Sequence, residues 1–208
     1  MATGLAMGGL IRVFVQARMD SERFPGKVLA SFRGEPLIRH VLRAAADVVG
    51  EQNVVVCTST DSSDDPLVAY LESIGVATFR GPLDDVFERF RLCLQVFPCE
   101  WVLRITADSP VLDRELLRRV VDAAAPDVDI VATVAPQGHN ASLIRSDMLL
   151  TVDPNELRAS DREHIVTFFA QPSVPCRFRW VMSALGSGNN PSFAVDTIKD
   201  LRRIEAML

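Results

Sequence analysis

Short apolar runs alternate with amphipathic segments along the first two thirds of this chain. Each run has the length of one buried strand, and the runs cover residues 10–15, 53–58, 76–79, 101–105 and 129–134. Between them, apolar residues recur at helical spacing, as in residues 37–45 and 116–121. A helix between two such strands returns the chain to the same end of the sheet, so the strands run parallel. The alternation therefore predicts an α/β fold with a doubly wound, mostly parallel mixed sheet flanked by helices.

The alternation of strand and helix patterns ends in the last third of the chain. Residues 136–140 are rich in turn formers, and residues 160–170 have the pattern of a helix with Glu163 at the capping-box position. The end of the chain predicts two further strands and a closing helix, at residues 176–182, 193–195 and 197–208. We expect residues 10–208 to form a single domain, preceded by a loose tail of residues 1–9.

Composition and charge exclude several classes of protein. With 22 Lys and Arg against 27 Asp and Glu, the formal net charge is -5, whereas binding to a nucleic-acid backbone needs a basic surface. The four cysteines have no metal-ligand spacing. No apolar run is long enough to span a bilayer, and residues 1–9 lack the basic start of a secretory signal. We therefore expect a cytoplasmic protein that partners neither nucleic acid nor a membrane.

A basic loop follows the first predicted strand. It places Arg18, Arg23 and Lys27 in one short segment together with Ser21 and Gly26. In an open α/β sheet, ligands bind beyond the carboxyl ends of the strands, where cations and loop amides hold polyphosphates. The residues themselves leave two interpretations open at about equal weight, an anion site or a solvated basic surface.

Two aspartates follow apolar runs at predicted strand ends. Asp108 comes after residues 102–105 and Asp196 after residues 193–195, so both can face the crevice that the basic loop lines. Carboxylates there suit Mg²⁺, which takes oxygen ligands and is usually bound by one or two carboxylates plus substrate phosphates. The alternative, of comparable weight, is that each aspartate caps the helix that follows it.

Several other acidic side chains and one histidine have two interpretations each. Asp61, Asp64 and Asp65 lie beyond the second predicted strand, where they can hydrogen-bond a ribose or a base edge, or cap the helix that begins near Pro66. Asp84 and Asp85 precede a predicted helix, where capping is the favoured interpretation. His164 can approach a substrate, although most single histidines on helices are structural or exposed.

Residues 16–29 read Gln-Ala-Arg-Met-Asp-Ser-Glu-Arg-Phe-Pro-Gly-Lys-Val-Leu. This segment matches throughout the signature Gln-Ala-Arg-Met-x-Ser-x-Arg-x-Pro-Gly-Lys-x-Leu, and the chain resembles the cytidylyltransferases that activate acidic sugars, especially their spore coat polysaccharide biosynthesis branch. The resemblance covers the chain from Leu10 onward. Further matches follow in the family's order: Thr58-Ser59-Thr60-Asp61, Arg80-Gly81, Asp84-Asp85-Val86, residues 104–110, Arg162-Glu163-His164 and Val195-Asp196-Thr197.

The resemblance implies a nucleotide-diphospho-sugar transferase-like (Rossmann-like) fold. It also implies transfer of CMP from CTP to a sugar or sugar acid, with release of pyrophosphate. Arg18, Lys27 and Asp108 are then the expected catalytic residues, and Asp108 and Asp196 the expected Mg²⁺ ligands. Relatives are often dimers, so a homodimer is the assembly that the resemblance suggests. The expected nucleotide contacts are Gln16, Ala17, Arg18, Ser21, Arg23, Lys27, Thr60, Asp61, Arg80 and Asp84.

The resemblance is incomplete on the acceptor side. His164 and Asn140 are the expected acceptor contacts, but relatives usually carry Pro-x-Gly-x-Asp-x-Glu where residues 136–142 read Pro-Gln-Gly-His-Asn-Ala-Ser, so both carboxylates are missing. Either the acceptor differs, or the chain is a nucleotide-binding protein with weak or lost transferase activity. A glycosyltransferase of the same fold ranks low, because residues 107–110 read Ala-Asp-Ser-Pro in place of the usual Asp-x-Asp motif.

Overall fold

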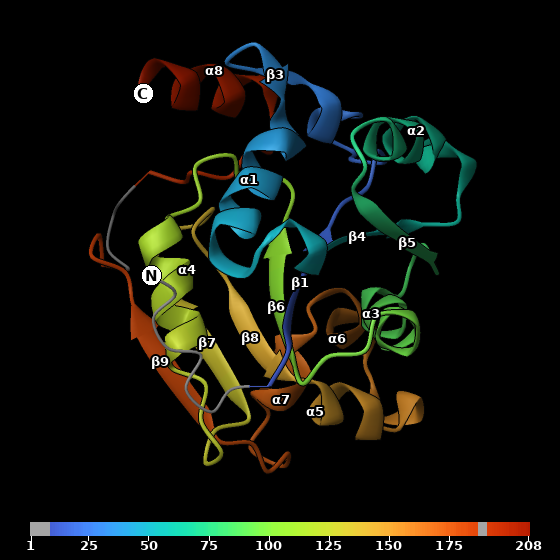
Figure 1. Cartoon of the computed structure of the whole chain (residues 1–208), viewed down its shortest axis with the longest axis vertical. Coiled ribbons are helices and arrows are strands. Elements are labelled where there is room, and N and C mark those ends of the chain that lie inside the picture. Colours follow the sequence, from blue (N-terminus) through green and yellow to red (C-terminus); the bar gives the residue numbers. More distant parts are fainter. Residues whose placement is uncertain (1–8, 187–190) are drawn as a thin grey trace.

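Seven strands form one sheet in the part of the chain that the computed structural model describes, residues 9–186 and 191–208. The strand order is β5-β4-β1-β6-β8-β7-β9 (Figure 1). The predicted tail of residues 1–9 lies, except for Gly9, outside the described residues. The strands are β1 (Ile11–Gln16), β4 (Val54–Ser59), β5 (Ala77–Gly81), β6 (Trp101–Thr106), β7 (Ile130–Val134), β8 (Ser142–Arg145) and β9 (Phe178–Met182), with a separate hairpin of β2 (Ser31–Phe32) and β3 (Glu35–Pro36).

The sheet is mostly parallel, as predicted. Strand β1 pairs in parallel with β4 and β6, β4 with β5, and β7 with β9. Strand β8 pairs antiparallel with both β6 and β7. The remaining six strands of this sheet therefore all run in the same direction. The carboxyl ends of β1, β4 and β6 therefore meet at the same edge, which is where ligands bind in open α/β sheets.

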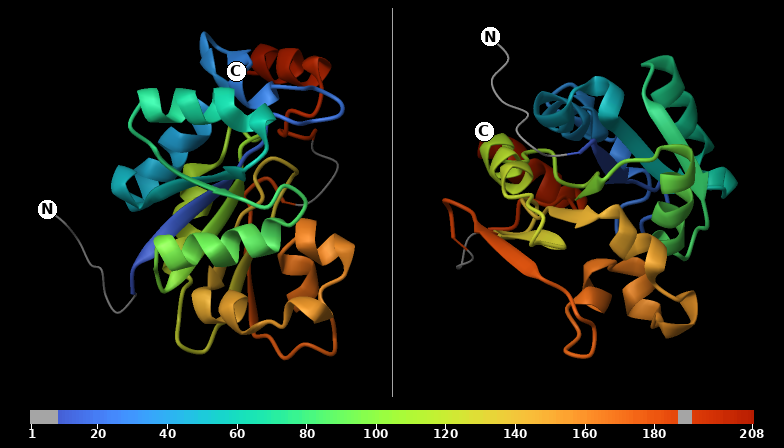
Figure 2. Two further views of the ribbon diagram at one scale, coloured as in Figure 1. Left: turned by 90° about the vertical axis from the view of Figure 1, so that its right-hand side faces the viewer. Right: turned by 60° about the horizontal axis from the view of Figure 1, so that its bottom comes forward.

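Helices cover both faces of the sheet (Figure 2). Alternate residues of β1 enter different cores: Val13 and Val15 pack with α1, α2, α4 and α8, whereas Phe14 packs with α3, α5 and α7. Burial on both faces explains why the centre of β1, residues 13–15, is continuously apolar. No described helix is long and apolar enough to cross a bilayer. The helices are α1 (Leu37–Val49), α2 (Asp65–Ser73), α3 (Val86–Val96), α4 (Arg114–Asp122), α5 (Ser146–Thr151), α6 (Ala159–Glu163), α7 (Val166–Phe169) and α8 (Ile198–Ala206), with the 3₁₀ turns η1 (Lys27–Leu29), η2 (Glu51–Asn53), η3 (Ser62–Asp64) and η4 (Pro154–Glu156).

The helix caps decide one alternative left open by the sequence. The Asp113 carboxylate accepts a hydrogen bond from the backbone N–H of Leu116 and caps α4. Thr197 caps α8 in a capping box with Asp200. The interpretation of Asp108 and Asp196 as helix caps is therefore wrong, and both carboxylates are left for other partners. Asp85 caps α3, so the capping prediction for the Asp84–Asp85 pair is confirmed for its second member.

Strand β8 was not predicted. It inserts between β6 and β7, and Leu143 and Ile144 enter opposite cores. A strand of four residues with two adjacent apolar side chains gives no detectable alternation. Its antiparallel pairing with both neighbours makes the sheet mixed, at a position that the sequence did not indicate.

The predicted helix of residues 160–170 is wrong in its continuity. It is divided into α6 and α7 around His164, and α6 starts with a capping box of Arg158 and Asp161 instead of one ending at Glu163. The buried Asp161 carboxylate also accepts from Thr167 Oγ1 at 2.8 Å and from Gln171 Nε2 at 3.2 Å. These bonds hold residues 167–171 against the start of α6, a position that a continuous helix would not allow.

The predicted strand at residues 193–195 is also wrong. Phe193 N–H donates to the Gln137 carbonyl at 2.7 Å, and Val195 N–H donates to the Asp108 carbonyl at 2.8 Å. The segment thus bonds to two separate loops instead of to one neighbouring strand. Its apolar character reflects burial, since Val195 is fully buried.

Candidate functional site

A cavity of about 550 Å³ opens beyond the carboxyl ends of β1 and β6. It brings together the basic loop, both predicted metal ligands and the end of α6, which are far apart in the sequence. The predicted site residues that line it are Gln16, Ala17, Arg18, Ser21, Arg23, Lys27, Asp84, Asp108, His164 and Asp196.

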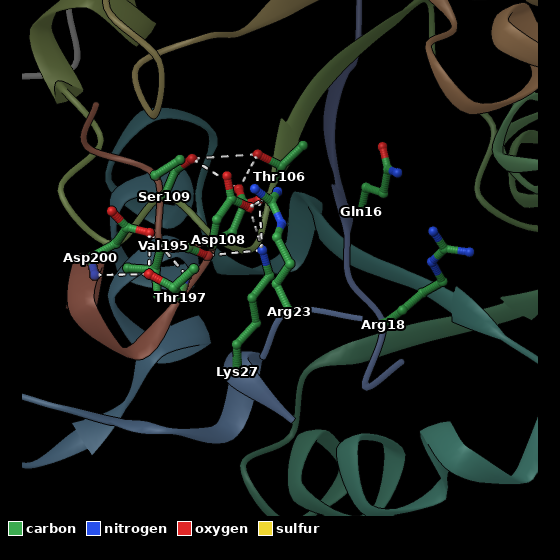
Figure 3. A network of polar contacts seen from close by, with 12 residues as sticks. Gln16, Arg18, Arg23, Lys27, Thr106, Asp108, Ser109, Val195, Thr197 and Asp200 are labelled. Carbon is green, nitrogen blue, oxygen red and sulfur yellow. Dashed lines mark hydrogen bonds and ion pairs between the residues drawn. The ribbon is translucent and has the colours of Figure 1, made fainter. Parts of the chain in front are cut away.

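Lys27 connects the basic loop to both predicted metal ligands, and Figure 3 shows its side chain directed toward Asp108. Its Nζ lies 3.2 Å from Asp108 Oδ2 and 3.2 Å from Asp196 Oδ1, and it donates to the Val195 carbonyl at 2.8 Å. Arg23 adds a second cation, with one guanidinium nitrogen 3.0 Å from Asp196 Oδ1. The structure therefore gathers cations and carboxylates at one point, as predicted, although of the two carboxylates only Asp108 follows a strand end.

The two aspartates are held by different means. Asp108 follows β6 by two residues, and its Oδ1 accepts from Thr106 Oγ1 at 2.7 Å and from Ser109 Oγ at 3.2 Å. Asp196 depends on packing between loops. Gly138 has a φ of +93°, and a Cβ there would lie 2.3 Å from the carbonyl carbon of Phe193. Only glycine fits this close approach, which lets the turn after β7 support the segment that carries Asp196.

A second polar cluster forms the opposite wall of the cavity. Gln16 Nε2 donates to Glu163 Oε1 at 3.1 Å, and an Arg18 nitrogen lies 3.4 Å from the same oxygen. Arg104 donates to Gln16 Oε1 at 2.7 Å, while its Nε has no partner among the described residues. Burial lowers the pKa of Arg104, although the charge of Glu163 opposes that shift. Sequence reasoning treated Glu163 as a cap, and the charged Arg104 inside an apolar strand was the available signal for this cluster.

Asp64 organises the start of the basic loop, a role that the sequence did not reveal. The residue is fully buried. Its carboxylate accepts from Met19 N–H at 2.7 Å, Thr58 Oγ1 at 2.8 Å and Ser59 N–H at 2.9 Å. It thereby joins the loop after β1 to the end of β4. Gly26, with a φ of +72°, then turns the loop back, and its N–H donates to the Met19 carbonyl at 2.8 Å.

Four predicted site residues lie outside this cavity. Asp61 accepts from Ser63 N–H at 2.9 Å at the start of η3. Arg80 donates to the carbonyls of Ser59 and Asp61 and pairs with Asp65 at 2.8 Å. The other two, Thr60 and Asn140, are exposed on the loops after β4 and β7.

The profile of a protein family described as cytidylyltransferase matches residues 12–183. The matched range contains the basic loop, Asp108 and Glu163. The chain belongs to the cytidylyltransferase family. This confirms the resemblance drawn from the segment of residues 16–29.

Curated relatives of this cytidylyltransferase include a polysaccharide biosynthesis protein and another cytidylyltransferase. Spore coat polysaccharide biosynthesis protein SpsF from Bacillus subtilis is 27% identical over an alignment of 207 positions, which covers 95% of this chain and 85% of SpsF. A 3-deoxy-manno-octulosonate cytidylyltransferase from Anaeromyxobacter sp. is 29% identical over an alignment of 178 positions, which covers 84% of this chain and 68% of that protein.

Solved structures confirm the predicted nucleotide-diphospho-sugar transferase-like fold of this cytidylyltransferase. A cytidylyltransferase from Leptospira borgpetersenii has a TM-score of 0.87 at 22% identity, covering 95% of this chain and 85% of that one. CMP:2-keto-3-deoxy-manno-octonic acid synthetase complexed with CTP has a TM-score of 0.68 at 16% identity, covering 95% of this chain and 97% of that one.

The cytidylyltransferase site offers a limited donor set for a metal ion. No group of three or more His, Cys, Asp or Glu side chains within residues 9–186 and 191–208 is arranged to hold one. Asp108 and Asp196 provide two carboxylates that share the Lys27 ammonium. Such a pair suits Mg²⁺ only when phosphates and water supply the remaining ligands. The donor set therefore fits a cation that binds together with a nucleotide.

Proposed function

We propose that this cytidylyltransferase transfers CMP from CTP to a hydroxyl of a sugar or sugar acid and releases pyrophosphate, in the cytoplasm, for surface polysaccharide biosynthesis. The observation that carries the proposal is the meeting of Arg18, Arg23 and Lys27 with Asp108 and Asp196 around one cavity at the strand ends. A triphosphate needs cations for its phosphates, and a nucleotidyl transfer needs its reacting groups held in line. The similarity to a 3-deoxy-manno-octulosonate cytidylyltransferase supports the acceptor class, and the similarity to a spore coat polysaccharide biosynthesis protein supports the pathway.

In this reaction the acceptor oxygen forms a bond to the α-phosphorus, and the bond from that phosphorus to the β-phosphate oxygen breaks. The acceptor hydroxyl loses its proton. The protein binds and orients: Arg18 and Lys27 neutralise the charge of the departing pyrophosphate, and Arg23 assists. Asp108 and Asp196 would hold Mg²⁺, which supplies further neutralisation of the phosphate oxygens.

A panel assay tests the proposed function. We expect the protein to release pyrophosphate from CTP when Mg²⁺ and a suitable sugar acid are present, and to release little without the acceptor. Pyrophosphate is measured by a coupled phosphate assay and the CMP-sugar by mass spectrometry. The control is the same panel with UTP or ATP in place of CTP. If no acceptor in the panel leads to pyrophosphate release, the proposed transferase activity is wrong.

The altered turn of residues 136–142 favours a second candidate function, a nucleotide-binding protein with weak or lost transfer. Ser142 lies opposite Arg104 in the register of β6 and β8. The family resemblance implies a carboxylate at this position, where it would face the Arg104 guanidinium, whose Nε has no partner among the described residues. Calorimetry separates the two candidates, because CTP binding without turnover supports the second and absence of CTP binding excludes both.

We propose a homodimer built on the outer edge of β9. Among the described residues this strand pairs only with β7, which leaves its other edge open. Trp180 is 57% exposed and Met182 is 51% exposed, both on the same face of the strand. Antiparallel pairing of β9 with its copy would satisfy the open backbone groups and cover this apolar surface.

A charged substitution at this edge tests the assembly. We expect the wild type to elute as a dimer and Trp180→Glu to elute as a monomer, because a buried unpaired carboxylate opposes association. Light scattering after size-exclusion chromatography gives the masses. Trp180→Phe is the matched control and should stay dimeric, and a monomeric wild type would contradict the proposal.

A further inference from the structure

The Lys27 ammonium has all its hydrogen-bonding capacity engaged within the protein. An ammonium carries three N–H donors. The three oxygens within reach of Nζ belong to Asp108, Asp196 and the Val195 carbonyl, at 3.2, 3.2 and 2.8 Å. The side chain is only 12% exposed. In this arrangement no N–H of Lys27 is left for a phosphate group.

The backbone of Lys27 is fixed, whereas its side chain has room to reorient. Gly26 and Lys27 donate to the carbonyls of Met19 and Phe24, and the neighbouring Val28 is buried in the core. The ammonium sits on a flexible four-carbon stem at the wall of the cavity. A change of partner therefore needs only side-chain rotation.

The charges around the carboxylate pair are already balanced. Lys27 and Arg23 supply two positive charges for Asp108 and Asp196. A divalent cation on the same oxygens would lie next to the ammonium, and like charges a few ångströms apart repel strongly at a partly buried site. Lys27 and a divalent cation therefore compete for the same carboxylate oxygens.

We propose that Lys27 is an exchangeable counter-ion that couples nucleotide binding to divalent-cation binding. Without nucleotide, its ammonium occupies the Asp108–Asp196 pair and keeps the affinity for a divalent cation low. A triphosphate draws the ammonium to its phosphates and so releases both carboxylates. The inference rests on the proposed function, since it couples the binding of the two ligands that the proposed function assigns to this site. By linkage, each ligand raises the affinity for the other by the same factor.

Removing the ammonium should then raise the affinity for a divalent cation and lower the affinity for the nucleotide. Lys27→Met keeps the length of the side chain and deletes its charge. We expect the nucleotide-free variant to bind Mn²⁺ about 10-fold more tightly than the wild type, because the carboxylates have lost their competing cation. We expect the same variant to bind CTP, without divalent cation, about 10-fold more weakly. Simple damage to the site would weaken both.

The experiment measures free Mn²⁺ by electron paramagnetic resonance during titration of the protein, and CTP binding by calorimetry. Lys199→Met, which removes the exposed lysine of α8, is the matched control and should change neither affinity. Lys27→Arg keeps a cation and should not gain Mn²⁺ affinity, and Lys27→Gln replaces Lys27→Met if that variant fails to fold.

The outcomes separate the inference from the proposed function. Tighter Mn²⁺ binding by Lys27→Met than by wild type, together with weaker CTP binding, supports it. Equal or weaker Mn²⁺ binding by both neutral variants overturns it, even if the wild type releases pyrophosphate. Absence of pyrophosphate release by the wild type counts against the proposed function alone, because the Mn²⁺ comparison uses no acceptor and no turnover.

Discussion

Replacing Asp108 by asparagine should lower the rate of pyrophosphate release by about 100-fold or more, with little loss of stability. The amide has nearly the same shape, and its oxygen can still accept from Thr106 Oγ1, which lies 2.7 Å from Asp108 Oδ1. What the variant loses is the negative charge that faces Lys27 and, in the proposed function, the charge that holds Mg²⁺. The measurement is kcat for pyrophosphate release, with the midpoint of thermal unfolding recorded for the same preparation.

Asp122→Asn is the control for this variant. Asp122 is exposed at the end of α4 and lies outside the cavity, so its neutralisation should leave kcat unchanged. A rate for Asp108→Asn within a few-fold of the wild type would show that the negative charge at the end of β6 is not used in the reaction. A rate loss accompanied by an equally large loss of folded protein would point to a structural role of Asp108 instead.

The parallel part of the fold was predictable because burial leaves a strong trace in the sequence. Strands β1, β4 and β6 are buried on both faces over most of their length and therefore appear as mainly apolar runs. Strand β8 has no such trace, since its position between β6 and β7 is decided by antiparallel pairing with strands distant in sequence. The break between α6 and α7 was equally hidden, because it depends on the tertiary contacts of Asp161.

The candidate site was predictable where chain direction alone decides the geometry. Asp108 and the basic loop follow neighbouring parallel strands, so their proximity follows from the topology. Asp196 lines the cavity, as predicted, but it follows an irregular buried segment instead of the predicted strand. The partners Glu163 and Asp64 escaped prediction because one-dimensional patterns cannot separate a helix cap from a carboxylate that bonds across the fold.

Asp64→Ala should destabilise the protein by about 3–5 kcal/mol, the largest stability effect that we expect among the loop residues. The substitution leaves the buried N–H of Ser59, the buried hydroxyl of Thr58 and the partly buried N–H of Met19 without their acceptor. For a chain of this size the loss corresponds to roughly 10 °C in the midpoint of thermal unfolding. The neighbouring Asp65→Ala is the matched control and should cost less than about 1 kcal/mol, because Asp65 is exposed and pairs with Arg80 at the surface.

The contribution of Asp64 to the free energy of unfolding should also decrease as the pH falls. Burial by itself raises the pKa of this carboxyl, but the hydrogen bonds from Met19, Ser59 and Thr58 outweigh burial and lower the pKa below its usual 3.8. A carboxyl with a lowered folded-state pKa stabilises the fold above its unfolded-state value, and this contribution is lost as the pH falls through the folded-state pKa. The difference in unfolding free energy between wild type and Asp64→Asn should therefore be largest near neutral pH and shrink below about pH 4. Urea unfolding at a series of pH values measures it, and a difference that stays constant or grows toward acid would show that Asp64 is not held as a carboxylate in the folded protein.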